Sequence, residues 1–336
     1  MIIKNINLVN FRNHDTYNLD CQKDTTLIIG KNGCGKTSVL EAIYILTQGK
    51  SFRATDPEIL KRGKEFYRIE LLKENGEKII STYDGKNKTF NVLDKKTHRL
   101  TKKDKYPIIL FLPSDLNLIH SSPSRRREYF DRFFSQLNEE YNNLIKKYDK
   151  AIHQRNELLK SPNPTKDALF SWNLLLAKYG TRINLLRNNF INEINLEFNK
   201  TYYSIANHQD DIKIIYETDL IISTEENYLK TLEQNYEKDI YLGHTSFGIH
   251  RDDIKFKFNH KDADGSASRG EVRSIMLALK FIEANMIFKY LQQKPIVLLD
   301  DVFSELDHER RNCLVKNFKD HQVIITSVEN IELPIS

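Results

Sequence analysis

An eight-residue loop near the amino terminus has the composition of a phosphate-binding loop. It follows the pattern G-x-x-x-x-G-K-[ST] between a strand-like stretch and a helical one, and consists of Gly30, Lys31, Asn32, Gly33, Cys34, Gly35, Lys36 and Thr37. Its glycines let backbone N–H groups turn toward a phosphate, and the helix start adds donors and a positive dipole end. We expect Lys36 to bind the β- and γ-phosphates and the Thr37 hydroxyl to bind Mg²⁺. The loop predicts nucleotide binding.

Two adjacent acids end an apolar run near the carboxyl terminus. Residues 295–299 read Pro-Ile-Val-Leu-Leu, and Asp300 and Asp301 follow them. Such a run predicts a buried parallel strand, whose carboxyl end faces the ligand crevice of an α/β sheet. In a P-loop enzyme the first acid holds Mg²⁺ and the next can deprotonate the attacking water. We therefore predict Asp300 as a metal ligand, with Asp301 and Lys36 as the catalytic residues. Without the phosphate loop, the same two acids would more often be a capped loop.

The segments at both ends of the chain read as α/β structure. Their apolar periodicity and their turn signals, such as Asn75-Gly76 and Asp84-Gly85, predict short strands and two helices. The strands are expected within residues 2–29 and 65–112, and at 212–216, 254–258 and 296–299. The helices are expected at 37–47 and at about 270–290.

The middle of the chain is helical in character. From Ser124 to Ile152 apolar residues recur at steps of three and four, which predicts one amphipathic helix of about eight turns. Ser161–Pro164 interrupts this helix, and a second periodic stretch runs from Trp172 to Ile194. The simplest interpretation is a pair of antiparallel helices that build a core of their own.

The spacing of the two motifs agrees with an inserted lobe. Most of the chain separates Lys36 from Asp300, whereas a compact GTPase or small kinase would place them far closer together. Long insertions are typical of ABC-type ATPases that carry a second lobe. We therefore predict an α/β fold: an ABC-type ATPase head formed by residues 1–117 and 240–336, with residues 118–239 as an inserted, mainly helical lobe.

Composition excludes several classes of protein. Of the 336 residues 40% are hydrophobic, enough for a sizeable core, yet no apolar run approaches the ~20 residues of a membrane span. The amino terminus lacks the features of a signal peptide, and Cys21, Cys34 and Cys313 make no even disulfide framework. We expect a reduced, cytoplasmic protein that has no membrane partner.

The net charge of +5 is less informative than its distribution. Six basic residues crowd into residues 95–105, and Arg125, Arg126 and Arg127 follow further on. Such clusters can track the phosphates of a nucleic acid. A solvated hairpin and an ordinary helix start explain them equally well.

Further motifs along almost the whole chain resemble the RecF family, within the SMC class of ABC-type ATPases. Gly248–Asp253 and Asp300–Asp307 are the most distinctive of them. The others, besides the phosphate loop, are Asn10–Asn13, Gly49–Arg53, Phe111–Leu116, Ser122–Asp131 and Gln154–Asn156.

This resemblance implies an ATP-dependent DNA-binding protein of recombinational gap repair, replication restart and SOS induction. ATP and Mg²⁺ would be its cofactors, and single-stranded, double-stranded or gapped DNA its substrate. ATP binding would drive formation of a homodimer that clamps DNA, and slow hydrolysis would release it, making the protein a weak DNA-stimulated ATPase. The family also works with the recombination mediator RecR.

The resemblance also implies a second half of the nucleotide site. Ser268 and Gly270 stand at the family's signature motif, which faces the nucleotide held by the partner subunit. Arg269 and Glu271 replace the usual glutamines there, and Glu271 adds an acid near the implied phosphate. Asp301 replaces the longer glutamate that is common in other ABC ATPases, which is consistent with slow hydrolysis.

Two other functions share the phosphate loop and the acid pair. The first is the nucleotide-binding subunit of a membrane transporter, against which the separate helical lobe and Asp300–Asp307 argue. The second is a structural SMC-type chromosome protein, for which the stretch from Ser124 to about Ala206 is too short to form long coiled-coil arms.

Overall fold

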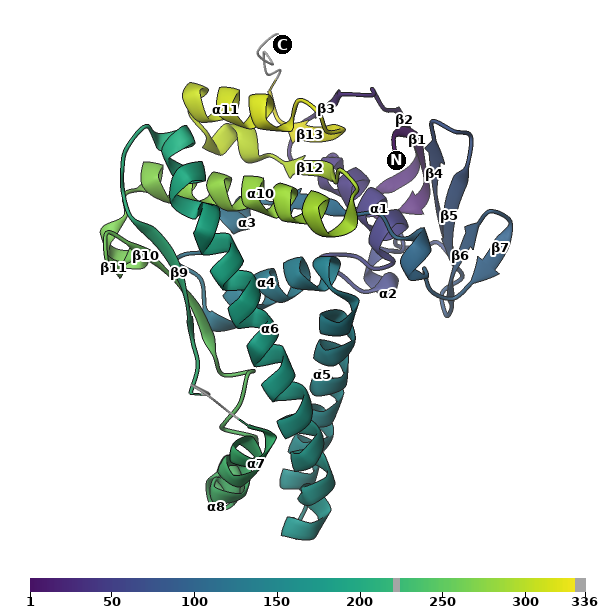
Figure 1. Ribbon diagram of the computed structural model, residues 1–336. Helices are drawn as coiled ribbons and strands as arrows, with labels where there is room; N and C mark the ends of the chain where they lie inside the picture. Colours follow the sequence, from purple (N-terminus) through teal and green to yellow (C-terminus); the bar gives the residue numbers. More distant parts are fainter. Residues whose placement is uncertain (220–223, 330–336) are drawn as a thin grey trace. The chain divides into compact units, whose positions relative to one another are not determined.

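The structure is a computed structural model that describes residues 1–219 and 224–329 (Figure 1). The chain forms two compact units, here called unit 1 (Met1–Asp115 with Glu283–Ser336) and unit 2 (Leu116–Ile282). The fold is mixed α/β with a helical insertion, as the sequence predicts. Among the described residues, no helix has the length and apolar character needed to cross a membrane.

A six-stranded antiparallel sheet makes up one layer of unit 1, in the order β2-β1-β4-β5-β6-β7. Gly76 and Gly85 lie in the two turns after β4 and β5 with φ of 84° and 86°, which glycine adopts most readily. The strands are β1 (Ile3–Phe11), β2 (His14–Asp20), β4 (Tyr67–Lys73), β5 (Lys78–Tyr83), β6 (Lys88–Val92) and β7 (Lys95–Thr97).

A four-stranded parallel sheet makes up a second layer of unit 1, in the order β3-β13-β12-β8. The strands are β3 (Thr25–Ile29), β8 (Ile108–Phe111), β12 (Ile296–Asp300) and β13 (Val323–Ser327). Every residue of β8, β12 and β13 is buried, which explains their continuous apolar runs. Because the strands are parallel, the phosphate loop that follows β3 lies at the same end of the sheet as Asp300 and Asp301, which stand at the carboxyl end of β12.

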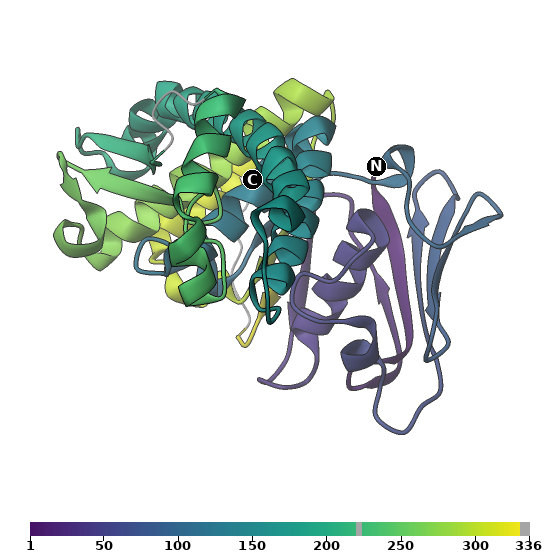
Figure 2. The same ribbon diagram turned by 90° about the horizontal axis from the view of Figure 1, so that it is seen from below.

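Helix α1 (Lys36–Gln48) packs against strands of both sheets of unit 1. Apart from Thr37 and Gln48, all of its residues are buried, in keeping with a helix enclosed on more than one side. In Figure 2 this helix lies beside the antiparallel sheet at the right. The shorter helices of unit 1 are α2 (Asp56–Ile59), η1 (Lys102–Asp104), η2 (Val302–Glu305) and α11 (His308–Phe318).

A buried glutamine joins the two layers of unit 1. The Gln322 side chain accepts a hydrogen bond from Ile3 N at 2.8 Å and donates to Ile3 O at 2.7 Å and to Gln22 O at 2.9 Å. Gln322 directly precedes β13, and Ile3 begins β1. One side chain thus links β1 of the antiparallel sheet to the start of β13 in the parallel sheet.

Unit 2 is built on two long helices, α5 and α6, which pack against each other (Figure 1). The helices are α4 (Pro123–Leu137), α5 (Glu139–Leu159), α6 (Lys166–Ala206), α7 (Glu225–Gln234), α8 (Tyr236–Leu242) and α9 (Ala263–Ser266). Helix α10 (Arg269–Leu291) contains the boundary to unit 1, and α3 (Pro113–Leu116) contains the other boundary. The small sheet of unit 2 consists of β9 (Ile212–Glu217), β10 (Asp253–Phe258) and β11 (Lys261–Asp262).

The first helix predicted for the middle of the chain is two helices. Asn138 has an extended conformation, and its side chain accepts a hydrogen bond from Tyr141 N at 3.0 Å, so it ends α4 and caps α5. The apolar period continues across the break, which is why it indicated a single helix. The break at Ser161–Pro164 and the second long helix are confirmed.

The boundary of the inserted lobe also differs from the sequence interpretation. Unit 2 extends to Ile282, whereas residue 240 was expected to begin the return to the ATPase head. The reason is strand pairing between segments that are distant in sequence. Strand β10 pairs with β9 and packs on α4, so residues 240–282 belong to unit 2. The first boundary, expected after residue 117, lies after Asp115.

Candidate functional site

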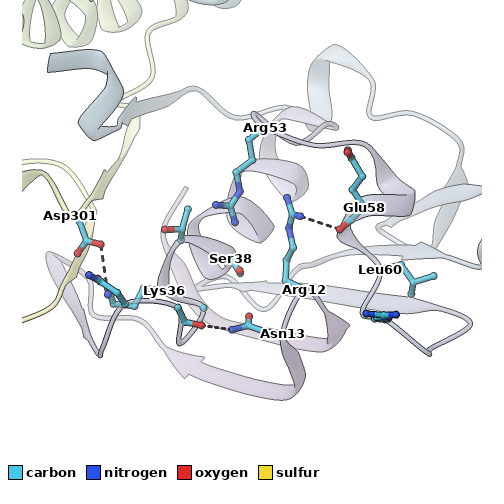
Figure 3. A pocket seen from close by; sticks show the side chains of 13 residues that line it. Arg12, Asn13, Lys36, Ser38, Arg53, Glu58, Leu60 and Asp301 are labelled. Carbon is cyan, nitrogen blue, oxygen red and sulfur yellow. Dashed lines mark hydrogen bonds and ion pairs between the residues drawn. The ribbon is translucent and has the colours of Figure 1, made fainter. Parts of the chain in front are cut away.

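The phosphate loop is braced by the turn between β1 and β2. Asn13 Nδ2 donates to Gly33 O at 2.8 Å (Figure 3). His14 Nε2 lies 3.2 Å from Gly35 O. Gly35 has a φ of 101°, and a Cβ added there would lie 2.2 Å from His14 Nε2. The glycine is therefore required by both its backbone conformation and the close approach of this turn.

Lys36 folds back over the loop that precedes it. Its ammonium donates to Gly30 O at 2.7 Å and to Lys31 O at 3.3 Å, and lies 3.7 Å from Asp301 Oδ2. The Lys36 residue is 6% exposed. The positive charge of Lys36 is thus held against the loop by two carbonyl oxygens, and the Asp301 carboxylate neutralises it only in part.

The two residues predicted as metal ligands are in contact. Thr37 Oγ1 lies 2.8 Å and 2.9 Å from the two carboxylate oxygens of Asp300. Burial raises the pKa of Asp300, and hydrogen bonds from Thr37 and Thr326 oppose that effect. A hydroxyl and a carboxylate are oxygen ligands of the kind that Mg²⁺ takes when substrate phosphates and water complete its shell. The two residues therefore fit Mg²⁺.

Asp301 adopts a left-handed conformation, with φ 51° and ψ 18°. Its N–H donates to Thr326 Oγ1 at 2.9 Å and also to Thr326 O at 3.2 Å. Its Oδ2 faces Lys36, and its buried Oδ1 has no hydrogen-bond partner within the described residues. The carboxylate thus retains capacity to accept a proton or a hydrogen bond.

Asn13, Lys36, Thr37 and Asp301 border a cavity of about 660 Å³ in unit 1, and Asp300 lies behind Thr37 without lining it (Figure 3). Five of the eight predicted loop residues line it, and Gly30, Lys31 and Cys34 do not. The lining residues are Arg12, Asn13, Asn32, Gly33, Gly35, Lys36, Thr37, Ser38, Arg53, Glu58, Leu60, Arg62 and Asp301. Four of these side chains are cationic and two are acidic, so the lining carries an excess of positive charge.

Two of the cavity's arginines are held by one buried glutamate that the sequence analysis did not single out. Glu41 on α1 accepts two hydrogen bonds from Arg12, at 2.7 and 2.8 Å, and two from Arg53, at 2.9 and 3.1 Å. Burial raises the pKa of Glu41, but these bonds and one from Ser51 outweigh it, so the pKa lies below its usual value. The sequence feature that could have revealed Glu41 is its position as the single acid within the apolar pattern of residues 37–47.

Ser268 and Gly270, the residues at the signature position, lie in unit 2. Lys36, Thr37, Asp300 and Asp301 all lie in unit 1. Ser268 is exposed and caps α10: its N–H donates to Glu271 Oε2 at 2.6 Å, and its Oγ accepts from Glu271 N at 3.3 Å. Glu271, the acid noted beside the implied phosphate, thus forms a capping box with Ser268. Gly270 lies in the first turn of the same helix.

The arginines at 125–127 are largely used inside unit 2. Arg126 binds both carboxylate oxygens of Asp253, at 2.7 and 2.8 Å, and Arg127 donates to Asp252 O. Two of the motifs in the family resemblance, Ser122–Asp131 and Gly248–Asp253, therefore hold each other in place. Their arginine run has a structural role.

The parallel sheet, the loop after β3, the acids after β12 and the helical insertion together define an ABC-type ATPase head. The family model described as RecF/RecN/SMC N terminal domain matches residues 2–333. The chain belongs to the RecF family, which confirms the resemblance seen in its motifs.

Relatives in sequence and in structure support this assignment. The chain is 33% identical to the DNA replication and repair protein RecF of Clostridioides difficile (strain 630), over 98% of this chain and 92% of that protein. It is 38% identical to RecF of Natranaerobius thermophilus, over 92% and 86%. A solved structure of the recombination mediator protein RecF with ATPrS, in the RecFOR pathway, has a TM-score of 0.88 at 30% identity, covering 98% of this chain and 92% of that one. An SMC head bound to the C-winged helix domain of ScpA shares the fold alone, with a TM-score of 0.52 at 15% identity.

Proposed function

We propose that this protein binds ATP with Mg²⁺ in the cavity of unit 1 and uses it to control binding to DNA during replication and repair. The observation that carries the proposal is the convergence of Lys36, Thr37, Asp300 and Asp301 at one edge of the parallel sheet. Structures of RecF with ATP and with ATPrS, each 30% identical to this chain, support ATP as the nucleotide.

The cavity supplies what a triphosphate requires. Lys36, with Arg12 and Arg53 fixed by Glu41, places cations around the loop's backbone N–H groups. Thr37 and Asp300 would hold Mg²⁺, which neutralises phosphate charge when bound. Asp301, next along the chain, is placed to orient or deprotonate the attacking water. Because Asp301 stands where other ABC ATPases commonly have the longer glutamate, we propose slow hydrolysis by a weak ATPase that DNA stimulates.

The biological assignment follows the relatives. Their name places them in DNA replication and repair, and the solved structures belong to a RecFOR pathway. We propose that this chain acts in the cytoplasm at gapped DNA in recombinational repair, replication restart and SOS induction, together with a RecR-like mediator. The relatives support this function over that of a transporter subunit or an SMC chromosome protein.

The experiment that tests the proposal measures DNA binding and dimerisation together, with and without a non-hydrolysable ATP analogue. We expect the analogue to produce dimers and to tighten binding to gapped DNA in the same concentration range. A protein that binds the analogue but neither dimerises nor binds DNA would contradict the proposed clamp.

The lysines of residues 95–105 are the candidate DNA contacts in unit 1. Lys95, Lys96 and Lys103 are exposed, the first two on the edge strand β7. Replacing all three with alanine should weaken binding equally for different base sequences, because phosphate contacts carry no sequence information. The slope of log affinity against log salt should fall by roughly 0.7 to 0.9 for each phosphate that a lysine no longer neutralises.

A matched variant controls for the loss of charge. Lys23, Lys316 and Lys319 are also exposed lysines of unit 1, and their replacement removes the same charge elsewhere. A salt titration of both triple variants with the ATP analogue present separates the two effects. Equal slopes and affinities for both variants would remove Lys95–Lys105 from the DNA-binding surface.

Ser268 is proposed to act on the nucleotide of a partner subunit. Ser268→Arg should preserve ATP binding but block association and hydrolysis, with a stability loss of about 1 kcal/mol from the altered cap. Mixing it with Lys36→Ala should restore activity, because the mixed dimer has one intact phosphate loop facing one intact signature. Two variants that both act within their own subunit would restore nothing. ATPase assays on the mixture, with melting temperatures as a folding control, make the measurement.

A further inference from the structure

One hydroxyl group connects the two acids of the site. Thr326 lies on β13 opposite Asp300 on β12, and it is completely buried. Its Oγ1 donates to Asp300 Oδ1 at 2.8 Å and accepts the N–H of Asp301 at 2.9 Å. The donor and an acceptor position of the same hydroxyl are thus both in use, one for each acid.

Both acids need external support. Asp301 has a left-handed conformation, which aspartate tolerates better than most residues but which is still less favourable than the right-handed one, so bonds from neighbouring groups help to hold it there. The Asp300 carboxylate accepts hydroxyl hydrogen bonds from both Thr37 and Thr326 at Oδ1, and Thr37 Oγ1 also lies 2.9 Å from Oδ2. Of these two threonines, Thr37 belongs to the phosphate loop and is proposed to turn toward Mg²⁺. Thr326 is completely buried in the sheet, and its hydroxyl bonds to the two acids.

We propose that Thr326 is a positioning residue, whose hydroxyl fixes the orientation of the metal-binding Asp300 relative to the proposed base Asp301. The inference rests on the proposed function of this site. Without the hydroxyl, Asp300 loses one of its two hydroxyl donors, and Asp301 N–H retains only its longer hydrogen bond to Thr326 O at 3.2 Å. Both carboxylates then gain freedom to turn away from the positions that the reaction needs.

Thr326→Val is the direct test, because valine has nearly the same shape and cannot form hydrogen bonds. We expect the rate of hydrolysis to fall about ten- to a hundredfold, the effect of one buried hydrogen-bonding group. The Mg²⁺ concentration for half-maximal stimulation should rise several-fold. Thr326→Ser retains the hydroxyl and should recover most of both losses.

Two further readouts separate positioning from a structural role. ATP affinity measured in EDTA should change little, since it does not depend on the alignment of the two acids, and the melting temperature of the nucleotide-free protein should fall only by what the loss of one buried hydroxyl group explains. If Thr326→Val folds poorly, Thr326→Cys provides a second variant with a weak donor. The hydrolysis rate should then decrease from the wild type through Thr326→Ser to Thr326→Cys.

The outcomes distinguish this inference from the function on which it rests. If wild-type protein binds no ATP, the proposed function fails and the role of Thr326 fails with it. If wild type binds and hydrolyses ATP while Thr326→Val keeps the wild-type rate and Mg²⁺ requirement, only the role of Thr326 is overturned. A loss in Thr326→Val that serine does not rescue also overturns it, because the hydroxyl is then not the cause.

Discussion

Lys36→Ala should lose a hundredfold or more in ATP affinity. The ammonium sits almost fully buried beneath the loop, where carbonyl oxygens of Gly30 and Lys31 hold it in place. Charge-assisted hydrogen bonds to two phosphates contribute roughly 1.5 to 3 kcal/mol each, so their removal costs at least about a hundredfold. Arg12 and Arg53 remain at the cavity, so weak residual binding is expected. Titration with a fluorescent ATP analogue measures the change.

An exposed cysteine offers a second measurement of the same effect. Cys34 is exposed within the loop, whereas Cys21 and Cys313 are partly buried. Burial raises the pKa of Cys21 to about 12 and also raises that of Cys313, so a thiol reagent should modify Cys34 first. Although Cys34 does not itself line the cavity, it lies between Gly33 and Gly35, which do, so bound ATP should slow its modification in the wild type and in the surface control Lys23→Ala. Protection that persists in Lys36→Ala would contradict the role assigned to Lys36.

Asp301→Asn should separate ATP binding from hydrolysis. We expect ATP to bind with near wild-type affinity while hydrolysis falls by about 10² to 10⁴, the contribution of a general base. Asparagine is nearly isosteric and tolerates the left-handed conformation of this position, so the backbone should not move. The trapped ATP should increase the population of dimers.

Single-turnover hydrolysis and light scattering on one preparation test both parts. Asp320→Asn, an exposed acid of unit 1, controls for the loss of one negative charge. A wild-type rate in Asp301→Asn would exclude this carboxylate as the base. Lost ATP binding would mean instead that its ion pair with Lys36 is needed to build the site.

The parts of the site that were predicted are those in which local sequence dictates local structure. Glycines that allow inward-facing amides, a lysine at a helix start and acids after an apolar run each act through their neighbours in sequence. The strand 296–299 and the helix 37–47 were predictable for the same reason. The meeting of Thr37 with Asp300 was implied when both were predicted to bind Mg²⁺, whereas the strand order that brings the ends of β3 and β12 together was not predicted.

The residues that were missed act through contacts distant in sequence. Glu41 joins Arg12 and Arg53, which come from separate segments, and nothing near Glu41 in the sequence indicates either partner. The bonds of Thr326 to both acids were not predicted either, because threonine is common in strands and nothing near it in the sequence indicates Asp300 or Asp301 as a partner. The extent of unit 2 was missed likewise, since the pairing of β9 with β10 spans the α7 and α8 helices.

The strand order of the parallel sheet bears on how the protein is made. Its two central strands, β12 and β13, are synthesised after all the other described strands, and among these the edge strands β3 and β8 pair only with them. Unit 2 and the antiparallel sheet, by contrast, each draw their strands from one continuous stretch that is synthesised earlier. A nascent or prematurely terminated chain can therefore contain the complete phosphate loop and still have no closed sheet beneath it. Such chains would expose β3 and β8 to proteases, and ATP binding would become a property of the finished polypeptide alone.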